Sequence, residues 1–164
     1  MIHLNTYEQL LQEAEDAHVT VHEAYDLNGD CTPTKYLKGL YIDGHIALDT
    51  QLNTTAEKTS ILAEEMGHHF TTVGDITNLK DTGSRQQELD ARLWGYNRLI
   101  GLQGIIRAFE HHCQNRYEMA EYLDVPEDYL EEALDCYRSK YGVYTIVDNY
   151  TIYFIPNISV MKHF

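Results

Sequence analysis

Residues 63–69 read Ala63-Glu64-Glu65-Met66-Gly67-His68-His69 and lie inside a predicted helix over residues 56–70. Glu64 and His68 stand four positions apart, so their side chains share one helix face and can converge on a single cation. Glu65 lies between them and places a carboxylate where it can exchange protons with a nearby water. An isolated Glu/His pair at this spacing also forms simple surface hydrogen bonds. The stretch nevertheless predicts a metal site on a helix.

Two details of the stretch narrow this prediction. A register shifted by one residue pairs Glu65 with His69, but it puts Met66, which cannot exchange protons, in the position of the base. Gly67 lies in the helix interior, where Gly costs about 1 kcal/mol relative to Ala. A helical Gly usually has a packing reason, so we expect another backbone to approach closely there.

A metal site that keeps one place open for water needs a third protein ligand. Glu88, near the start of a predicted helix over residues 84–100, is the candidate, and Asp90 is the alternative. Two positions in a helix are about 200° apart, so Glu88 and Asp90 are not expected to bind the same ion. Asp75 has two interpretations, an acceptor that orients His68 or His69, or a turn residue. His69 faces either the substrate cleft or the side of its own helix, and we favour the second.

The other segments predict a mixed α+β fold. Thr6 is expected to cap the first helix, and Asp43-Gly44 is a pair typical of a tight hairpin turn. The expected elements are a helix over 7–17, an alternating segment over 19–25, a hairpin over 37–49, helices over 103–110, 116–123 and 126–140, and a final hairpin over 143–155. We expect a core over residues 1–102 and a helical extension over 103–164 that ends in a β-hairpin, packed as one compact unit.

Composition excludes several classes of protein. The chain has 164 residues with 43% hydrophobic and 23% charged residues, as in one ordinary globular domain. No apolar stretch approaches the roughly 20 residues of a membrane span, and no export signal opens the chain, so we expect a cytoplasmic protein without a membrane partner. A net charge of −14 argues against direct nucleic-acid binding. The three widely spaced cysteines are interpreted as reduced thiols.

The helices over 116–123 and 126–140 have the spacing of a helix-turn-helix. The second of them is rich in acidic residues, which a phosphate backbone would repel. These are Glu127, Asp128, Glu131, Glu132 and Asp135. We therefore interpret this pair as a packing or partner-binding unit.

Together, the hairpin over 37–49, the motif helix with Gly67 before His68, the segment over 71–76 and the Glu88-x-x-Ala91 helix resemble the ImmA/IrrE family of metallopeptidases. The resemblance is good over about residues 37–100 and loose elsewhere. It implies a minimal zincin fold and an intracellular metallo-endopeptidase that cleaves a DNA-binding, helix-turn-helix repressor of a phage or mobile element. Carried over by position, Glu65 is the catalytic base, and His68 and Glu88 are metal ligands.

Glu64 stands where the family most often has the first His of His-Glu-x-x-His. We expect zinc in this site. A set of Glu64, His68 and Glu88 is harder and more anionic than two His and one Glu, so manganese or another divalent ion is the alternative. The departure also leaves a second hypothesis, a non-catalytic antirepressor or adaptor that binds the repressor through the same scaffold and its acidic C-terminal helices. Neither the cleaved bond nor the oligomeric state follows from the sequence.

Overall fold

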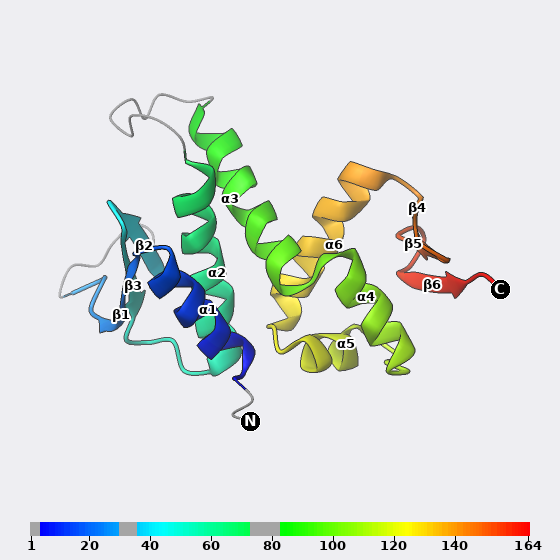
Figure 1. Ribbon diagram of the computed structural model, residues 1–164, viewed down its shortest axis with the longest axis horizontal. Coiled ribbons are helices and arrows are strands. Elements are labelled where there is room, and N and C mark those ends of the chain that lie inside the picture. Colours follow the sequence, from blue (N-terminus) through cyan, green and yellow to red (C-terminus); the bar gives the residue numbers. More distant parts are fainter. Residues whose placement is uncertain (1–3, 30–35, 73–82) are drawn as a thin grey trace. The chain divides into compact units, whose positions relative to one another are not determined.

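The computed structural model describes residues 4–29, 36–72 and 83–164, and these residues form a mixed arrangement of helices and two small sheets (Figure 1). The predicted α+β class is confirmed. The chain divides into two compact units, Met1–Gly95 and Tyr96–Phe164. The sequence placed the division after residue 102, and the boundary along the chain falls within helix α3 (Gly83–Leu99). No described helix combines the length and the apolar character that crossing a membrane requires.

The first unit has one three-stranded sheet with the order β1-β3-β2. Strands β2 (Gly39–Ile42) and β3 (His45–Asp49) form the predicted antiparallel hairpin, and Asp43 and Gly44 both have positive φ, at 46° and 79°. Strand β1 (Thr20–Tyr25) pairs parallel to β3, with Thr20 opposite His45. The alternation over 19–25 predicted a strand there, but it carried no information about its partner.

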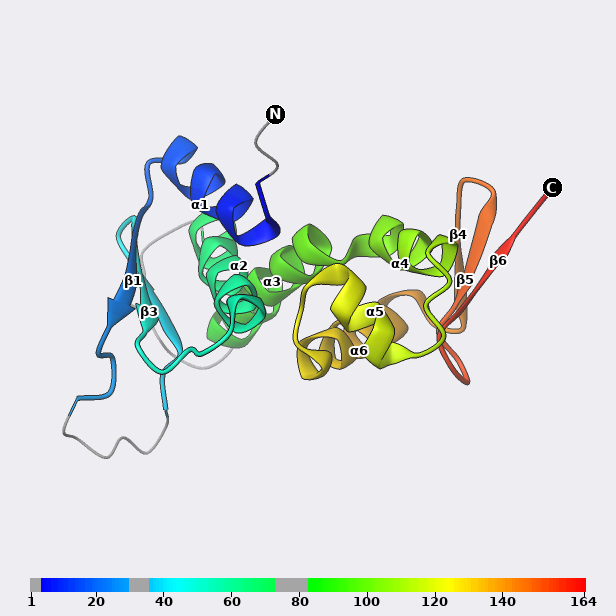
Figure 2. The same ribbon diagram turned by 90° about the horizontal axis from the view of Figure 1, so that it is seen from below.

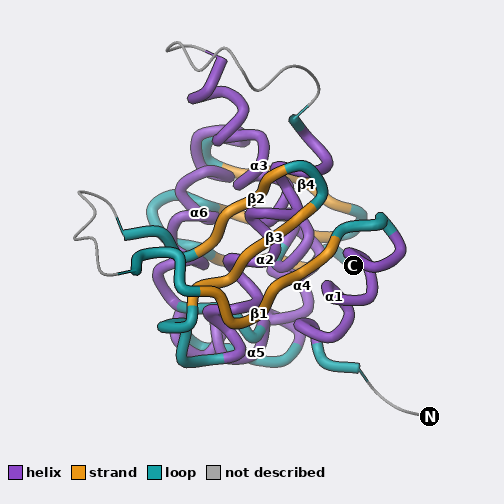
Figure 3. Tube along the Cα trace, turned by 90° about the vertical axis from the view of Figure 1, so that its left-hand side faces the viewer, coloured by secondary structure: helices purple, strands orange, loops and turns teal. Residues whose placement is uncertain are grey.

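Helices α1 (Thr6–Asp16) and α2 (Thr55–Thr71) cover one face of this sheet, which is seen in front of α2 in Figure 3. The buried apolar side chains of the unit come from both layers and include Leu10, Ile46, Leu48, Leu62 and Met66. The expectation that Thr6 caps the first helix was wrong. Asn5 is the N-cap, because Asn5 and Glu8 satisfy each other's backbone N–H groups in a capping box and Thr6 is already helical.

The second unit contains the remaining helices and a second sheet (Figure 2). Its elements are α4 (Gly101–Glu110), α5 (Arg116–Leu123), α6 (Glu127–Tyr141), β4 (Tyr144–Val147), β5 (Tyr150–Tyr153) and β6 (Ser159–Lys162). The helices lie close to their predicted ranges. The predicted terminal hairpin is β4–β5, but the chain ends in a three-stranded sheet, because β6 pairs antiparallel with β5. Cys113 and Cys136 are half-buried free thiols, as predicted, and Cys31 lies outside the described residues.

Candidate metal centre

Helices α2 and α3 approach each other closely at Gly67 (Figure 1). A Cβ atom built on Gly67 would lie 2.1 Å from the carbonyl oxygen of Ala91, far inside any real contact. The predicted close approach of another backbone is therefore confirmed, and that backbone belongs to α3. Because Gly67 directly precedes His68, the crossing sets the polar side chains of the two helices against each other.

Three of these side chains form a group with metal-ligand chemistry. Glu64, His68 and Glu88 each offer one ligand atom, and these atoms all lie within 4.8 Å of one another. The Nε2 atom of His68 is 3.3 Å from Oε2 of Glu88, and all three residues are half-buried. The structure thus brings together the Glu64, His68 and Glu88 set that the sequence singled out.

The two carboxyl groups of this set provide a test of whether a cation fits. Glu64 and Glu88 lie within hydrogen-bonding distance of each other. Two ionised carboxylates repel at such a separation unless a proton or a cation lies between them. An imidazole nitrogen and carboxylate oxygens are ligands that zinc and manganese both accept, and three protein donors leave a coordination position open. The residues therefore fit one divalent ion.

Of the alternative residues considered from the sequence, Asp90 does not join this group. The Oδ1 atom of Asp90 accepts a hydrogen bond from Nε2 of Gln86 at 2.8 Å, on its own helix. Glu88 and Asp90 point in different directions, as their spacing predicted. Asp75 lies outside the described residues.

Glu65 lies beneath strand β2 and is 8% exposed. Its carboxyl group accepts a hydrogen bond from the backbone N–H of Tyr41. A Cβ on Gly39 would lie 2.5 Å from Cγ2 of Ile61 and 2.7 Å from Oε1 of Glu65, so the strand passes close to both side chains and a larger residue would require them to shift. Burial, together with the smaller effect of the neighbouring charges of Glu64 and Glu88, raises the pKa of Glu65 to about 8. The structure therefore places a buried carboxyl group next to the donor set.

Arg92 was not identified from the sequence as part of the site. Its Nε atom is 2.9 Å from Oε1 of Glu88 and 3.4 Å from Oε1 of Glu64. Burial tends to raise the pKa of Glu88, but Arg92, His68 and the hydrogen bond with Glu64 together lower this pKa below its ordinary value. The contact with Glu88 was visible in the sequence as a pair four residues apart on a helix. The contact with Glu64 was not, since it joins two helices.

Aromatic side chains surround the end of α2. The hydroxyl of Tyr41 lies 2.9 Å from Nδ1 of His69, and the rings of Phe70 and Trp94 stack at 5.1 Å. His69 therefore contacts β2 through Tyr41, whereas the sequence analysis favoured the side of its own helix. Gly39 and Tyr41 lie on the same face of β2 by the two-residue period of a strand, and the Gly inside a strand was a signal of close approach that the sequence analysis did not use.

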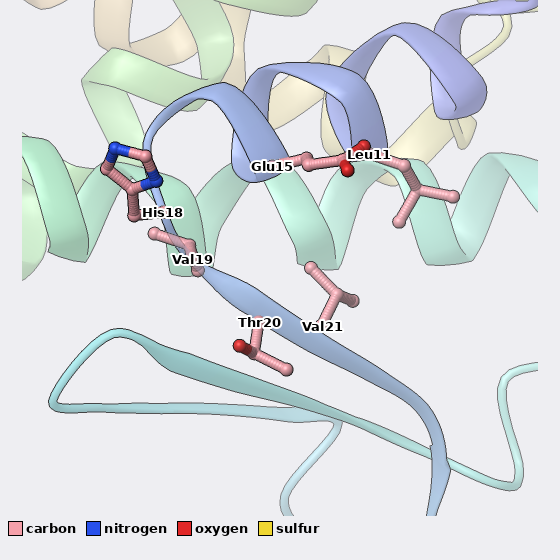
Figure 4. A pocket seen from close by; sticks show the side chains of 6 residues that line it. All are labelled: Leu11, Glu15, His18, Val19, Thr20 and Val21. Atoms are coloured by element: carbon pink, nitrogen blue, oxygen red, sulfur yellow. The ribbon is translucent and has the colours of Figure 1, made fainter.

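A shallow pocket lies elsewhere in the first unit, where α1 meets β1 (Figure 4). Its lining shares no residue with the Glu64, His68 and Glu88 group, and consists of Leu11, Glu15, His18, Val19, Thr20 and Val21. The side chains of Glu15 and His18 do not converge in Figure 4. This pocket therefore offers no second constellation of catalytic groups.

Comparisons of the chain with family models, curated proteins and solved structures found no match.

Proposed function

We propose that this protein is a metal-dependent endopeptidase whose ion is held by Glu64, His68 and Glu88. The observation that carries the proposal is the convergence of three donor side chains from two helices, with a buried carboxyl group next to them. Resemblance to the ImmA/IrrE metallopeptidases over about residues 37–100 points to the same chemistry. Zinc is the proposed ion, and manganese is the alternative because two of the three donors are carboxylates.

Each residue of the site has a separate task in this proposal. A divalent ion bound there would supply the Lewis acid that polarises the carbonyl of the scissile peptide bond. In its ionised form, Glu65 would accept a proton from the attacking water and later deliver one to the leaving amine. Its burial beneath β2 keeps this proton exchange away from bulk water. His68 and Glu88 are positioned by the close packing of α2 against α3 at Gly67.

Strand β2 supports a peptide substrate in particular. Among the described residues β2 pairs with β3 alone, so its other edge is open at the place where Tyr41 reaches Glu65. An extended chain binds to such an edge through backbone hydrogen bonds. A peptide aligned in this way would pass directly over the base.

We propose that the substrate is a DNA-binding repressor protein, a proposal that rests on the family resemblance. The acids of α6 favour contact with such a basic protein over contact with DNA itself, because Glu127, Glu131 and Glu132 are all exposed.

The decisive experiment is co-expression of the protein with a repressor encoded nearby, followed by detection of repressor fragments. Glu65→Gln keeps the size of the side chain but removes the base, so we expect cleavage to be lost while the fold and bound metal remain. Undiminished cleavage by this variant would refute the mechanism.

The same experiment distinguishes the adaptor hypothesis, which the replacement of a family His by Glu64 favours. A metal-free protein that binds an intact repressor would support the adaptor. In that case, reversing the charges of Glu127, Glu131 and Glu132 should weaken the complex, and an unchanged affinity would exclude α6 as the binding surface.

A further inference from the structure

The carboxylates of the candidate metal centre already have a cation of their own, the guanidinium of Arg92. Its Nε atom contacts Oε1 of Glu88 at 2.9 Å and Oε1 of Glu64 at 3.4 Å. The other oxygen of Glu88, Oε2, faces Nε2 of His68 at 3.3 Å. Glu88 therefore lies between two partners, with Arg92 on one side and the metal-ligand group on the other.

We infer that Arg92 is an internal counter-ion that stabilises the metal-free centre and lowers its affinity for metal. The inference concerns the regulation of the proposed metal centre and rests on that part of the proposed function. Arg92 and a bound ion would neutralise the same two carboxylates, so the presence of either one reduces the stabilisation that the other provides. By linkage, a group that stabilises the metal-free state more than the metal-bound state weakens metal binding.

The charges of the donor set explain why such a residue is needed here. A set of two imidazoles and one carboxylate has a single negative charge, whereas Glu64, His68 and Glu88 with a neutral imidazole have two. A guanidinium is protonated at every physiological pH, so Arg92 returns the sum to a single negative charge. Arg92 thus compensates for the carboxylate that Glu64 adds.

The exposure of Arg92 allows it to act without blocking the site. Its side chain is 43% exposed, as is that of Glu88, while the side chains of His68 and Glu64 are each 24% exposed. The guanidinium is therefore more exposed than His68 and Glu64, and as exposed as Glu88. An ion held between Glu64, His68 and Glu88 would weaken its contacts by competing for the same carboxylate charge, without a change in the fold.

The test is a zinc titration of the folded full-length protein in competition with a chromophoric chelator. Arg92→Gln removes the charge, and Arg85→Gln is the matched control because Arg85 is exposed on the same helix and its loss changes the net charge equally. We expect Arg92→Gln to bind zinc roughly three- to tenfold more tightly than the natural chain, with Arg85→Gln close to unchanged. The melting temperature of the metal-free protein should fall further in Arg92→Gln than in Arg85→Gln.

Two additional variants make the test specific. In a Glu64→Gln background one of the two carboxylates that Arg92 neutralises is absent, so removing Arg92 should raise the zinc affinity by a smaller factor. Arg92→Lys keeps the charge but not the planar fork, and we expect a smaller rise in affinity than with Gln. If Arg92→Gln alone does not fold without metal, the comparison of Glu64→Gln with the Glu64→Gln/Arg92→Gln double variant decides the matter, and an unchanged or weaker zinc affinity on removing Arg92 there overturns the inference.

The outcomes separate this inference from the proposed function. Weaker or unchanged zinc binding by a folded Arg92→Gln variant overturns the inference while the metal centre stands. Absence of zinc binding in both the natural chain and Arg92→Gln overturns the inference and the metal centre together. The expected rise in affinity without any cleavage of a repressor supports the inference and counts against the peptidase alone.

Discussion

The contact between α2 and α3 at Gly67 gives the sharpest structural prediction, because two effects of Gly67→Ala have opposite signs. Ala is favoured over Gly in a helix interior by about 1 kcal/mol, so helix propensity alone predicts a more stable protein. The new Cβ would lie 2.1 Å from the backbone oxygen of Ala91, however, and real Cβ atoms essentially never come within 3.0 Å. The helices must separate by the difference, at least 0.9 Å.

A separation of this size should lower both the stability of the fold and the affinity for metal. The obstacle is a backbone atom that no rotamer change can move, and overpacking of this kind costs about 1–3 kcal/mol. We therefore expect a net destabilisation of about 0–2 kcal/mol after the propensity gain is subtracted, which is about 1–3 kcal/mol relative to a Gly→Ala change that has the same gain without the clash. Metal–ligand distances tolerate only about 0.2 Å, so moving His68 away from Glu88 should weaken zinc binding roughly 10- to 100-fold.

Urea denaturation and zinc titration of Gly67→Ala measure the two effects. Gly104→Ala in α4 is the control, since its Cβ would meet side-chain tips and no backbone, at 3.3 Å from Cδ2 of Leu123 and 3.7 Å from Nη2 of Arg107. The control has the same gain in helix propensity and should be neutral or slightly more stable. If Gly67→Ala is as stable as this control and binds zinc normally, the close crossing of α2 and α3 is refuted.

Three further predictions concern other contacts of the first unit. Asp49 is 1% exposed and accepts several hydrogen bonds that lower its pKa below 3.8 despite the opposing effect of burial, so Asp49→Asn should cost roughly 2 kcal/mol at pH 7. A carboxyl group whose pKa is lowered by folding stabilises the protein at pH values above its unfolded-state pKa, and this stabilisation is lost as the pH falls through the folded-state pKa. In urea melts, the difference in stability between the variant and the natural chain should therefore narrow from pH 5 towards pH 3. A constant difference would contradict this account. Asn5→Ala removes the cap of α1 and should cost about 1 kcal/mol in thermal melts, whereas no loss would return the capping role to Thr6. Tyr41→Phe removes the hydroxyl 2.9 Å from Nδ1 of His69 and should raise the mobility of that ring, measured by NMR relaxation of the imidazole; an unchanged ring would show that aromatic packing alone holds it.

The parts of the site that the sequence predicted are those set by spacing along one helix. Glu64 and His68 share a face because of the four-residue interval, and Gly67 indicated a close backbone neighbour that proved to be Ala91. Glu88 was identified because a third ligand was required and the resemblance placed it there. These inferences needed only helix geometry and the chemistry of a metal site.

The contacts that were missed join segments distant in the sequence. Arg92 reaches Glu64 across two helices, and nothing in either helix alone specifies that pairing. The parallel pairing of β1 with β3 likewise depends on α1 and α2 covering the same face of the sheet. Strand β6 has only four residues and little alternation, because three of its side chains are exposed at a sheet edge.

The most direct test is the metal content of the natural chain purified without chelator, compared with His68→Ala and Glu88→Gln. The account predicts one zinc or manganese ion per natural chain and a large loss of that ion in both variants. A natural chain without bound metal that also fails to take up added zinc, or an ion that survives both substitutions, would contradict it.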